Sequence, residues 1–178
     1  MREKLLLWEG IFVVSVCAVG SLLHFVYQWS GKKLFAGLVS PVNESTWEHL
    51  KLLFFPSLLF GAGEYLAVGK EIPHFLPAKA VSILAGMGII VVCFYTYTGI
   101  LGTNWLAADI LTFFLGVVCS SYFFLHFIHY PLFSKKASLG AVMLLAVVCA
   151  CFFVFTFSPP RIGLFRDPAG GGYGIQEK

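Results

Sequence analysis

Residues 43–49 hold the densest group of side chains in this chain that are suited to chemistry. They read Asn-Glu-Ser-Thr-Trp-Glu-His and include Glu44, Ser45, Glu48 and His49. On a helix that begins here, Ser45 and His49 are four residues apart and share a side. Imidazole and carboxylate groups together can hold a zinc ion with one coordination position left open for water. The segment therefore predicts a metal site with a hydrolytic role.

Two further residues, His24 and Asp109, are expected to approach His49 from other helices at a similar depth. We predict that His24, His49 and Asp109 ligate zinc or another divalent metal, which would make water nucleophilic near neutral pH. The predicted catalytic residues beside this metal are Glu44 and Glu48, as candidates for the general base, and Ser45.

A purely structural interpretation explains part of the same group. Ser45-x-x-Glu48 is a capping box, in which the serine caps a new helix and the glutamate reaches back to the first turn. His49 on its own is typical of an interfacial histidine with a satisfied hydrogen bond. The sequence contains neither H-x-x-x-H nor H-E-x-x-H, so the metal site and the helix cap both remain open.

The helices that must position these side chains are predicted to span a membrane. Of the 178 residues, 58% are hydrophobic and only 12% are charged, against about 25% in soluble domains. Five stretches are long and apolar enough to cross a bilayer. We predict an all-α polytopic membrane bundle over residues 1–158, with about five transmembrane helices at 5–29, 46–68, 78–99, 104–129 and 137–157.

Turn-forming residues separate these stretches at 30–33, 69–73, 102–104 and 131–136. The apolar segment 33–43 is too short to span and predicts a sixth, short or re-entrant element. Pro159 and Pro160 end the last helix. Residues 159–178 form an irregular tail rich in glycine and proline, which either folds over the bundle or extends into solvent.

Alternating helix directions sort the polar residues onto two faces of the membrane. The side that carries the loop 30–45, here called the first-loop face, gathers the predicted metal site and the tail residues Arg161, Arg166 and Asp167. The opposite face gathers a polar cluster of Glu9, Glu64, His126 and His129. Ionisable residues within spans are costly and mark function or structural pairing. This cluster is consistent with a proton relay, a second metal site, or interfacial side chains close to water.

Basic residues of the loops, tails and helix ends, Lys79 among them, are nearly balanced between the two faces and leave the orientation open. The net charge is only +3. Together with the lack of a basic stripe or recognition motif, this excludes nucleic acid as a predicted partner. The expected partners are the lipid bilayer, a lipid or small-molecule ligand, or another membrane protein.

Three segments resemble an uncharacterised family of small bacterial multi-pass membrane proteins. The most specific is residues 41–56, PVNESTWEHLKLLFFP; the others are FYTYTG at 94–99, and LFRDP at 164–168 followed by Tyr173 and Gly174. The resemblance covers most of the chain. It implies a location in the bacterial cytoplasmic membrane and brings no assigned activity.

Ser45-x-x-x-His49 is also similar to the serine–histidine motif of the alkaline ceramidase and adiponectin-receptor superfamily. That resemblance implies a zinc amide hydrolase in which Asp109 would stand for the aspartate ligand. The chain departs from the family in two respects: His126 and His129 are three residues apart instead of four, and the family has seven helices.

Three functional classes follow from these observations. The first is a membrane-embedded metal-dependent hydrolase acting on a lipid or amide, favoured because one face concentrates the polar groups. The second is a small-molecule binding or transport subunit, favoured by the carboxylates within the spans. The third is a structural or regulatory partner of another membrane protein.

Overall fold

The computed structural model describes residues 2–129 and 137–175 of the chain, and this part contains helices but no strand. Six α-helices and two short 3-10 helices follow one another: α1 (Arg2–Trp29), α2 (Leu34–Val39), α3 (Thr46–Ala67), η1 (Gly69–Glu71), α4 (Phe75–Leu101), α5 (Leu106–His129), α6 (Ala137–Phe157) and η2 (Gly163–Phe165). The predicted break at 131–136 lies outside the described residues.

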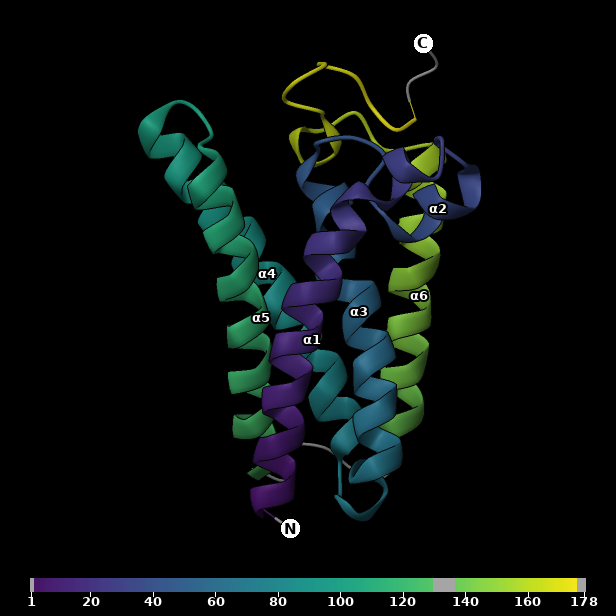
Figure 1. Ribbon diagram of the computed structural model, residues 1–178, viewed down its shortest axis with the longest axis vertical. Helices are drawn as coiled ribbons and strands as arrows, with labels where there is room; N and C mark the ends of the chain where they lie inside the picture. The colour runs from purple at the N-terminus through teal and green to yellow at the C-terminus, as the bar shows by residue number, and fades with distance from the viewer. Residues whose placement is uncertain (1, 130–136, 176–178) are drawn as a thin grey trace.

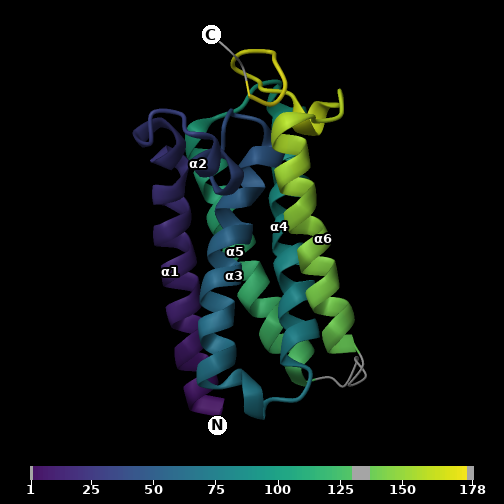
Figure 2. The ribbon, with the colours of Figure 1, turned by 90° about the vertical axis from the view of Figure 1, so that its right-hand side faces the viewer.

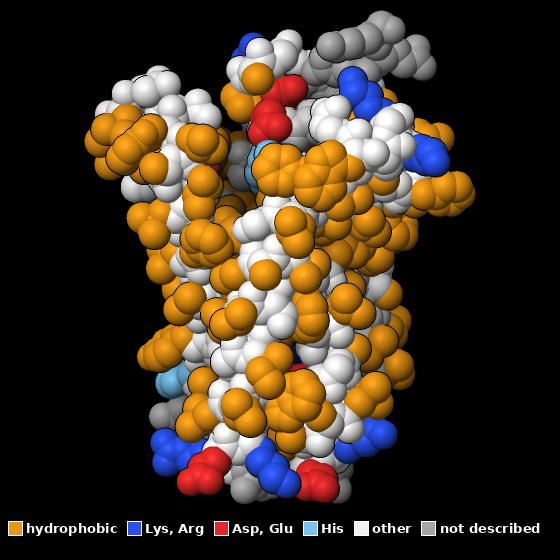
Figure 3. All heavy atoms as spheres, viewed as in Figure 1, with side chains coloured by type: hydrophobic (Ala, Val, Ile, Leu, Met, Phe, Trp, Pro, Cys, Tyr) orange, Lys and Arg blue, Asp and Glu red, His pale blue; other side chains and the backbone are white. Residues whose placement is uncertain are grey.

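Five of these helices, α1, α3, α4, α5 and α6, are long and apolar enough to cross a membrane. They run side by side in an elongated bundle with the two chain termini at opposite ends (Figures 1 and 2). Hydrophobic side chains cover the middle of the visible face, and charged side chains gather at the end near the N-terminus (Figure 3). The predicted all-α polytopic membrane bundle is confirmed.

The core of the bundle is built on α3 and α4, the two most buried spans. Buried side chains from every span meet there, among them Phe12, Val16, Leu53, Phe54, Ile83, Val117 and Phe152. Helix α4 packs most extensively along α5, and α3 along α1. The long helices thus hold the first turn of α3, with its candidate site residues, against α1.

Helix α4 begins at Phe75, three residues before the predicted start of the span. Pro77 lies in the first turn, where a helix tolerates proline because the missing N–H would have no partner within the helix. Lys79, which already falls within the predicted span 78–99, lies inside this helix with only 4% of its surface exposed. The consequence for Glu9 and Glu64 is described below.

The predicted sixth element is the short helix α2 at the first-loop face. It lies against α6 and is tied to α3 by the Lys51 ammonium, whose Nζ donates a hydrogen bond to the Gly37 carbonyl oxygen at 2.8 Å. The α4–α5 hairpin leans away from α1 at this end (Figure 1).

Candidate functional site

A close contact between α1 and α3 sets the distance between the two histidines. A Cβ atom on Gly20 of α1 would lie only 2.5 Å from the carbonyl oxygen of Leu52 in α3. His24 is one helical turn beyond Gly20, and His49 is one turn before Leu52. Since the two helices run in opposite directions, both histidines lie one turn closer to the first-loop face. Their ring centroids are 5.1 Å apart.

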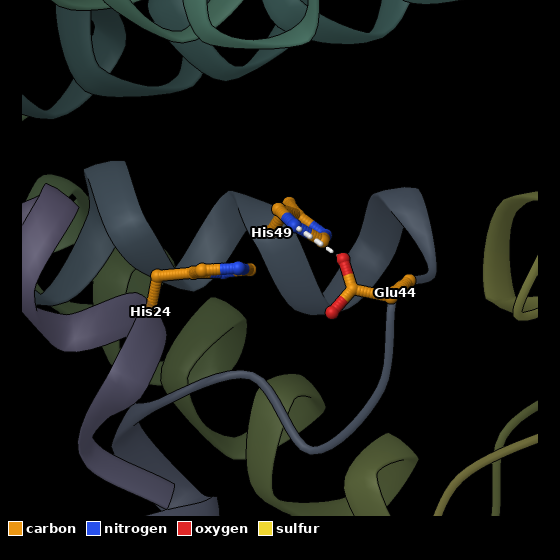
Figure 4. Close-up of side chains that lie close together, drawn as sticks. All are labelled: His24, Glu44 and His49. Carbon is orange, nitrogen blue, oxygen red and sulfur yellow. Dashed lines mark ion pairs between the residues drawn. The ribbon is translucent and has the colours of Figure 1, made fainter. Parts of the chain in front are cut away.

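The turn before α3 brings a carboxylate to the same place. Asn43 Oδ1 accepts a hydrogen bond from the Ser45 amide at 2.9 Å, and Ser45 Oγ accepts one from the Glu48 amide at 3.4 Å. Glu44, between them, directs its carboxylate at His49, with 3.4 Å between Oε2 and Nε2 (Figure 4). His24, Glu44 and His49 each offer one ligand atom, and these atoms lie within 4.8 Å of one another.

Hydrogen bonding determines which ring nitrogens are available in this group. His49 Nδ1 lies 3.0 Å from the Ser45 carbonyl oxygen. A carbonyl can only accept, so Nδ1 carries a proton and Nε2 faces Glu44. A backbone carbonyl on the second nitrogen is the usual way in which a metal-ligating histidine is oriented. His24 Nδ1 is buried and has no hydrogen-bond partner among the described residues, which is uncommon for a buried polar atom.

The Glu44 carboxylate is affected by its histidine neighbours. The hydrogen bond that the Glu44 carboxylate accepts from the protonated His49 ring is the main reason why the pKa of Glu44 is lowered, and it outweighs partial desolvation, which raises the pKa. Glu44 therefore stays ionised to more acidic pH than an ordinary glutamate. The ionised carboxylate is the form that can ligate a metal ion or pair with a protonated histidine.

A cavity of about 200 Å³ opens beside His49. Its polar lining includes Glu44, His49 and Asp109, and its apolar lining includes Ile90, Phe94 and Phe113. The hollow between the α4–α5 hairpin and the rest of the bundle is visible at the upper end of Figure 3, with a histidine side chain at its rim. A second cavity, of about 350 Å³, shares Thr46, Phe94 and Pro168 with the first and is lined by Arg166.

Asp109 lies on the other side of this cavity and is not part of the close group of ligand atoms. Its carboxylate accepts hydrogen bonds from the Tyr97 hydroxyl and, at 3.2 Å, from Asn104 Nδ2. The structure thus groups Glu44, which we predicted as a general base, with the two histidines. The predicted metal ligand Asp109 faces them across the cavity.

Glu48 points away from this group and into the bundle. With 2% of its surface exposed, it accepts hydrogen bonds from Lys51 Nζ at 2.6 Å and from the Val42 amide at 3.0 Å. Ser45 caps α3 as the capping box predicts, but Glu48 reaches the Val42 amide and not that of Ser45. Lys51 was not among the predicted site residues, although Glu48 and Lys51 have the spacing of three that places ion pairs on one side of a helix.

The tail folds back onto the first-loop face. Asn43 Nδ2 donates a hydrogen bond to the Gly174 carbonyl oxygen at 2.9 Å, and buried Phe165 packs on Trp47 with ring centroids 4.9 Å apart. Asp167 Oδ1 accepts a hydrogen bond from the Ala169 amide, and the Arg166 backbone pairs with Tyr173. Pro168 and Ala169 line the first cavity. Arg161 is exposed.

The opposite-face residues separate into two groups. Glu9 and Glu64 are buried and meet at Lys79, so neither reaches water by a short excursion. His129 is exposed, and its Nδ1 donates to the Leu125 carbonyl oxygen at 2.6 Å. The His126 ring stacks on Tyr122 with centroids 6.3 Å apart. The signal that we overlooked is Lys79, a charged residue inside a predicted span at the same end of the bundle as Glu9 and Glu64, where an ionisable residue needs a partner.

The lowered pKa of Glu44 leads to a prediction about acid stability. In metal-free protein, Glu44→Gln should lower the free energy of unfolding by at most about 1 kcal/mol, because the side chain is 54% exposed and solvent screens the ion pair. The contribution is fully present above the pKa of Glu44 in the unfolded chain and is lost as the pH falls through the lower, folded pKa. Thermal unfolding of the wild-type protein and of Glu44→Gln, measured from neutral to acidic pH, should therefore show their stabilities converging in acid. A difference in stability that grows as the pH falls would contradict the prediction.

No curated protein and no solved structure matches this chain. One family does, and its match extends over residues 2–175, which include all six helices, the His24–Glu44–His49 group and the described part of the tail. The chain therefore belongs to DUF6512, a family of unknown function.

Proposed function

We propose that this protein is a membrane-embedded, metal-dependent hydrolase that acts on a lipid ester or amide at the first-loop face. The observation that carries the proposal is the buried, unpartnered Nδ1 of His24, which lies beside His49 and Glu44. A buried nitrogen without a hydrogen-bond partner is costly. A metal ion would supply the missing partner.

The donor set is suited to zinc. Two imidazoles and one carboxylate form the protein part of many catalytic zinc sites, with a fourth position left for water or substrate. When bound, such an ion supplies Lewis-acid chemistry, polarising a carbonyl group and making water nucleophilic near neutral pH. The hydrogen bond from His49 Nδ1 to the Ser45 carbonyl oxygen keeps Nε2 directed at the site.

The cavity beside the site supports an amphiphilic substrate. Ile90, Phe94 and Phe113 provide an apolar lining, while His49 and Asp109 place polar groups in the same space. An acyl chain would lie along the apolar wall, and its ester or amide group would lie between the histidines and Asp109. Asp109 is the carboxylate suited to accept a proton from water, because Glu48 is already paired with Lys51.

Small-molecule binding without catalysis is the second candidate, favoured by the same cavity. A pocket that is mostly apolar with a few convergent polar groups is the usual form of a ligand site. This function needs the cavity but no metal, so metal binding distinguishes the two candidates.

The test is zinc binding by the full chain purified in mild detergent, without a histidine tag, stripped with chelator and dialysed against zinc. Elemental analysis should find about one zinc per chain. His49→Ala and His24→Ala should each weaken binding by about 100-fold or more, since each removes a direct ligand and even supporting partners contribute about 10- to 100-fold. His129→Ala, an exposed histidine at the other end, is the matched control and should bind zinc normally.

Activity is then measured on a panel of lipid esters and amides with zinc-loaded and zinc-free protein. Hydrolysis that requires zinc and is lost in His49→Ala supports the proposal. Wild-type protein that binds no zinc, or binds it equally well in His49→Ala, rejects the metal site. Zinc binding at the site without hydrolysis of any panel member would reject the assignment of this substrate class.

A further inference from the structure

A second group of buried charges lies at the opposite-face end of the bundle, away from the candidate metal site. Glu9 of α1, Glu64 of α3 and Lys79 of α4 meet there, with 2%, 0% and 4% of their surfaces exposed. Three separate helices therefore contribute one charge each to a place within the predicted membrane spans.

The contacts of the two carboxylates are unequal. Lys79 Nζ donates a hydrogen bond to Glu9 Oε1, and the Ser121 hydroxyl of α5 donates one to Glu9 Oε2. Both oxygens of Glu9 thus have a donor. Glu64 Oε2 lies 2.7 Å from Lys79 Nζ but without the geometry of a hydrogen bond, and Glu64 Oε1 is buried with no partner among the described residues.

Aromatic rings enclose the ammonium group. Lys79 Nζ lies 4.0 Å from the centre of the Phe12 ring and 3.8 Å from that of Phe124, with Phe75 slightly farther away at 5.6 Å. The ring faces favour the cation, and they help to keep the buried ammonium away from water. The described part of α5 contributes the Ser121 hydroxyl and Phe124 to these contacts but no charge.

The charges in this enclosure do not balance. One ammonium faces two carboxylates, whereas at the other buried ion pair one ammonium, Lys51, faces one carboxylate, Glu48. With both carboxylates ionised, the cluster would keep one negative charge away from water. Neutralisation by a proton is the usual outcome when the alternative is an uncompensated buried charge.

We propose that the Glu9–Lys79–Glu64 cluster is a proton-binding site within the membrane and that Glu64 holds the proton. Glu64 is the carboxylate with an unpartnered oxygen, so neutralising it costs the fewest hydrogen bonds. Glu9, with donors to both oxygens, remains the counter-ion of Lys79. Release of the proton would leave excess negative charge between α1, α3 and α4, and binding is therefore coupled to how these helices pack.

Infrared spectroscopy of the full chain in lipid at neutral pH tests this proposal. A protonated carboxylic acid has a C=O stretching band that a carboxylate lacks, and exposed glutamates are ionised at this pH. Wild-type protein should show a band of about one carboxylic acid per chain, shifted in D₂O. Glu64→Gln should remove the band. Glu9→Gln should remove it too, since the remaining carboxylate then pairs with Lys79 one to one.

Glu3→Gln and Glu71→Gln, which change exposed carboxylates, are the matched controls and should leave the band unchanged. Lys79→Met should increase the band to about two acids per chain, because neither carboxylate then has a counter-ion. A wild-type protein without the band, or a band that persists in Glu64→Gln, would overturn the proposal and leave the cluster as a structural ion pair. Zinc binding at the other end of the bundle is independent of either outcome.

Discussion

Lys51→Met is expected to lower the free energy of unfolding by about 3–5 kcal/mol, the usual cost of removing one partner from a buried ion pair. The fully buried Lys51 ammonium donates hydrogen bonds to Glu48 Oε2 and Thr156 Oγ1, both at 2.6 Å, and to the Gly37 carbonyl oxygen at 2.8 Å. These bonds join α3 to α6 and to the segment that contains α2. Methionine keeps much of the packing volume but leaves the Glu48 carboxylate without a cation.

Unfolding of the protein in mild detergent, by heat or by increasing SDS, measures this loss. Lys70→Met, at an exposed lysine, is the matched control and should change stability by no more than about 0.5 kcal/mol. Adding Glu48→Gln to Lys51→Met should restore part of the stability, because the buried carboxylate is then neutral. Equal stability of Lys51→Met and Lys70→Met would show that the ion pair does not hold this end of the bundle together.

Gly86→Val is expected to destabilise the bundle by about 1–3 kcal/mol or more through overpacking between α4 and α5. A Cβ atom at Gly86 would lie 2.6 Å from the Gly116 carbonyl oxygen and 2.8 Å from Ser120 Cβ. Backbone atoms cannot rotate away as a flexible side chain can, so the two helices must separate. Since both helices line the cavity beside His49, ligand binding there should weaken as well.

Gly88→Val provides the control, because it makes the same substitution two residues along the same helix. A Cβ atom there would meet nothing within 4 Å, and stability should change by no more than about 0.5 kcal/mol. Unfolding of the two variants under identical conditions compares them. If both lose the same stability, the effect belongs to valine within α4 and not to the contact with Gly116.

The two glycines illustrate the limit of sequence patterns in this chain. Both lie in an apolar helix, and a pattern of small residues predicts close helix packing for either. Only Gly86 approaches another backbone, because the rotation of α4 about its axis turns that side to α5. Gly61 and Gly63 in α3 show a similar contrast. Gly61 packs against the Lys79 side chain, whereas Gly63 faces open space.

The number and type of the long elements follow from local sequence pattern. Apolar runs of spanning length, separated by turn residues, leave a helix as the only structure that satisfies its own backbone in lipid. The five spans, the short element before α3 and the Ser45 cap were therefore predictable from local pattern. Membership of an uncharacterised family, suggested by residues 41–56, is confirmed by the match over residues 2–175.

Which polar side chains meet depends on how the helices pack in three dimensions. Glu44 and not Asp109 joins the two histidines, Glu48 turns inward to Lys51, and Lys79 completes the group of Glu9 and Glu64. Each pairing depends on the rotation and depth of one helix relative to another. That relation is set by packing between residues far apart in the chain, such as Gly20 against Leu52, and local pattern carries no information about it.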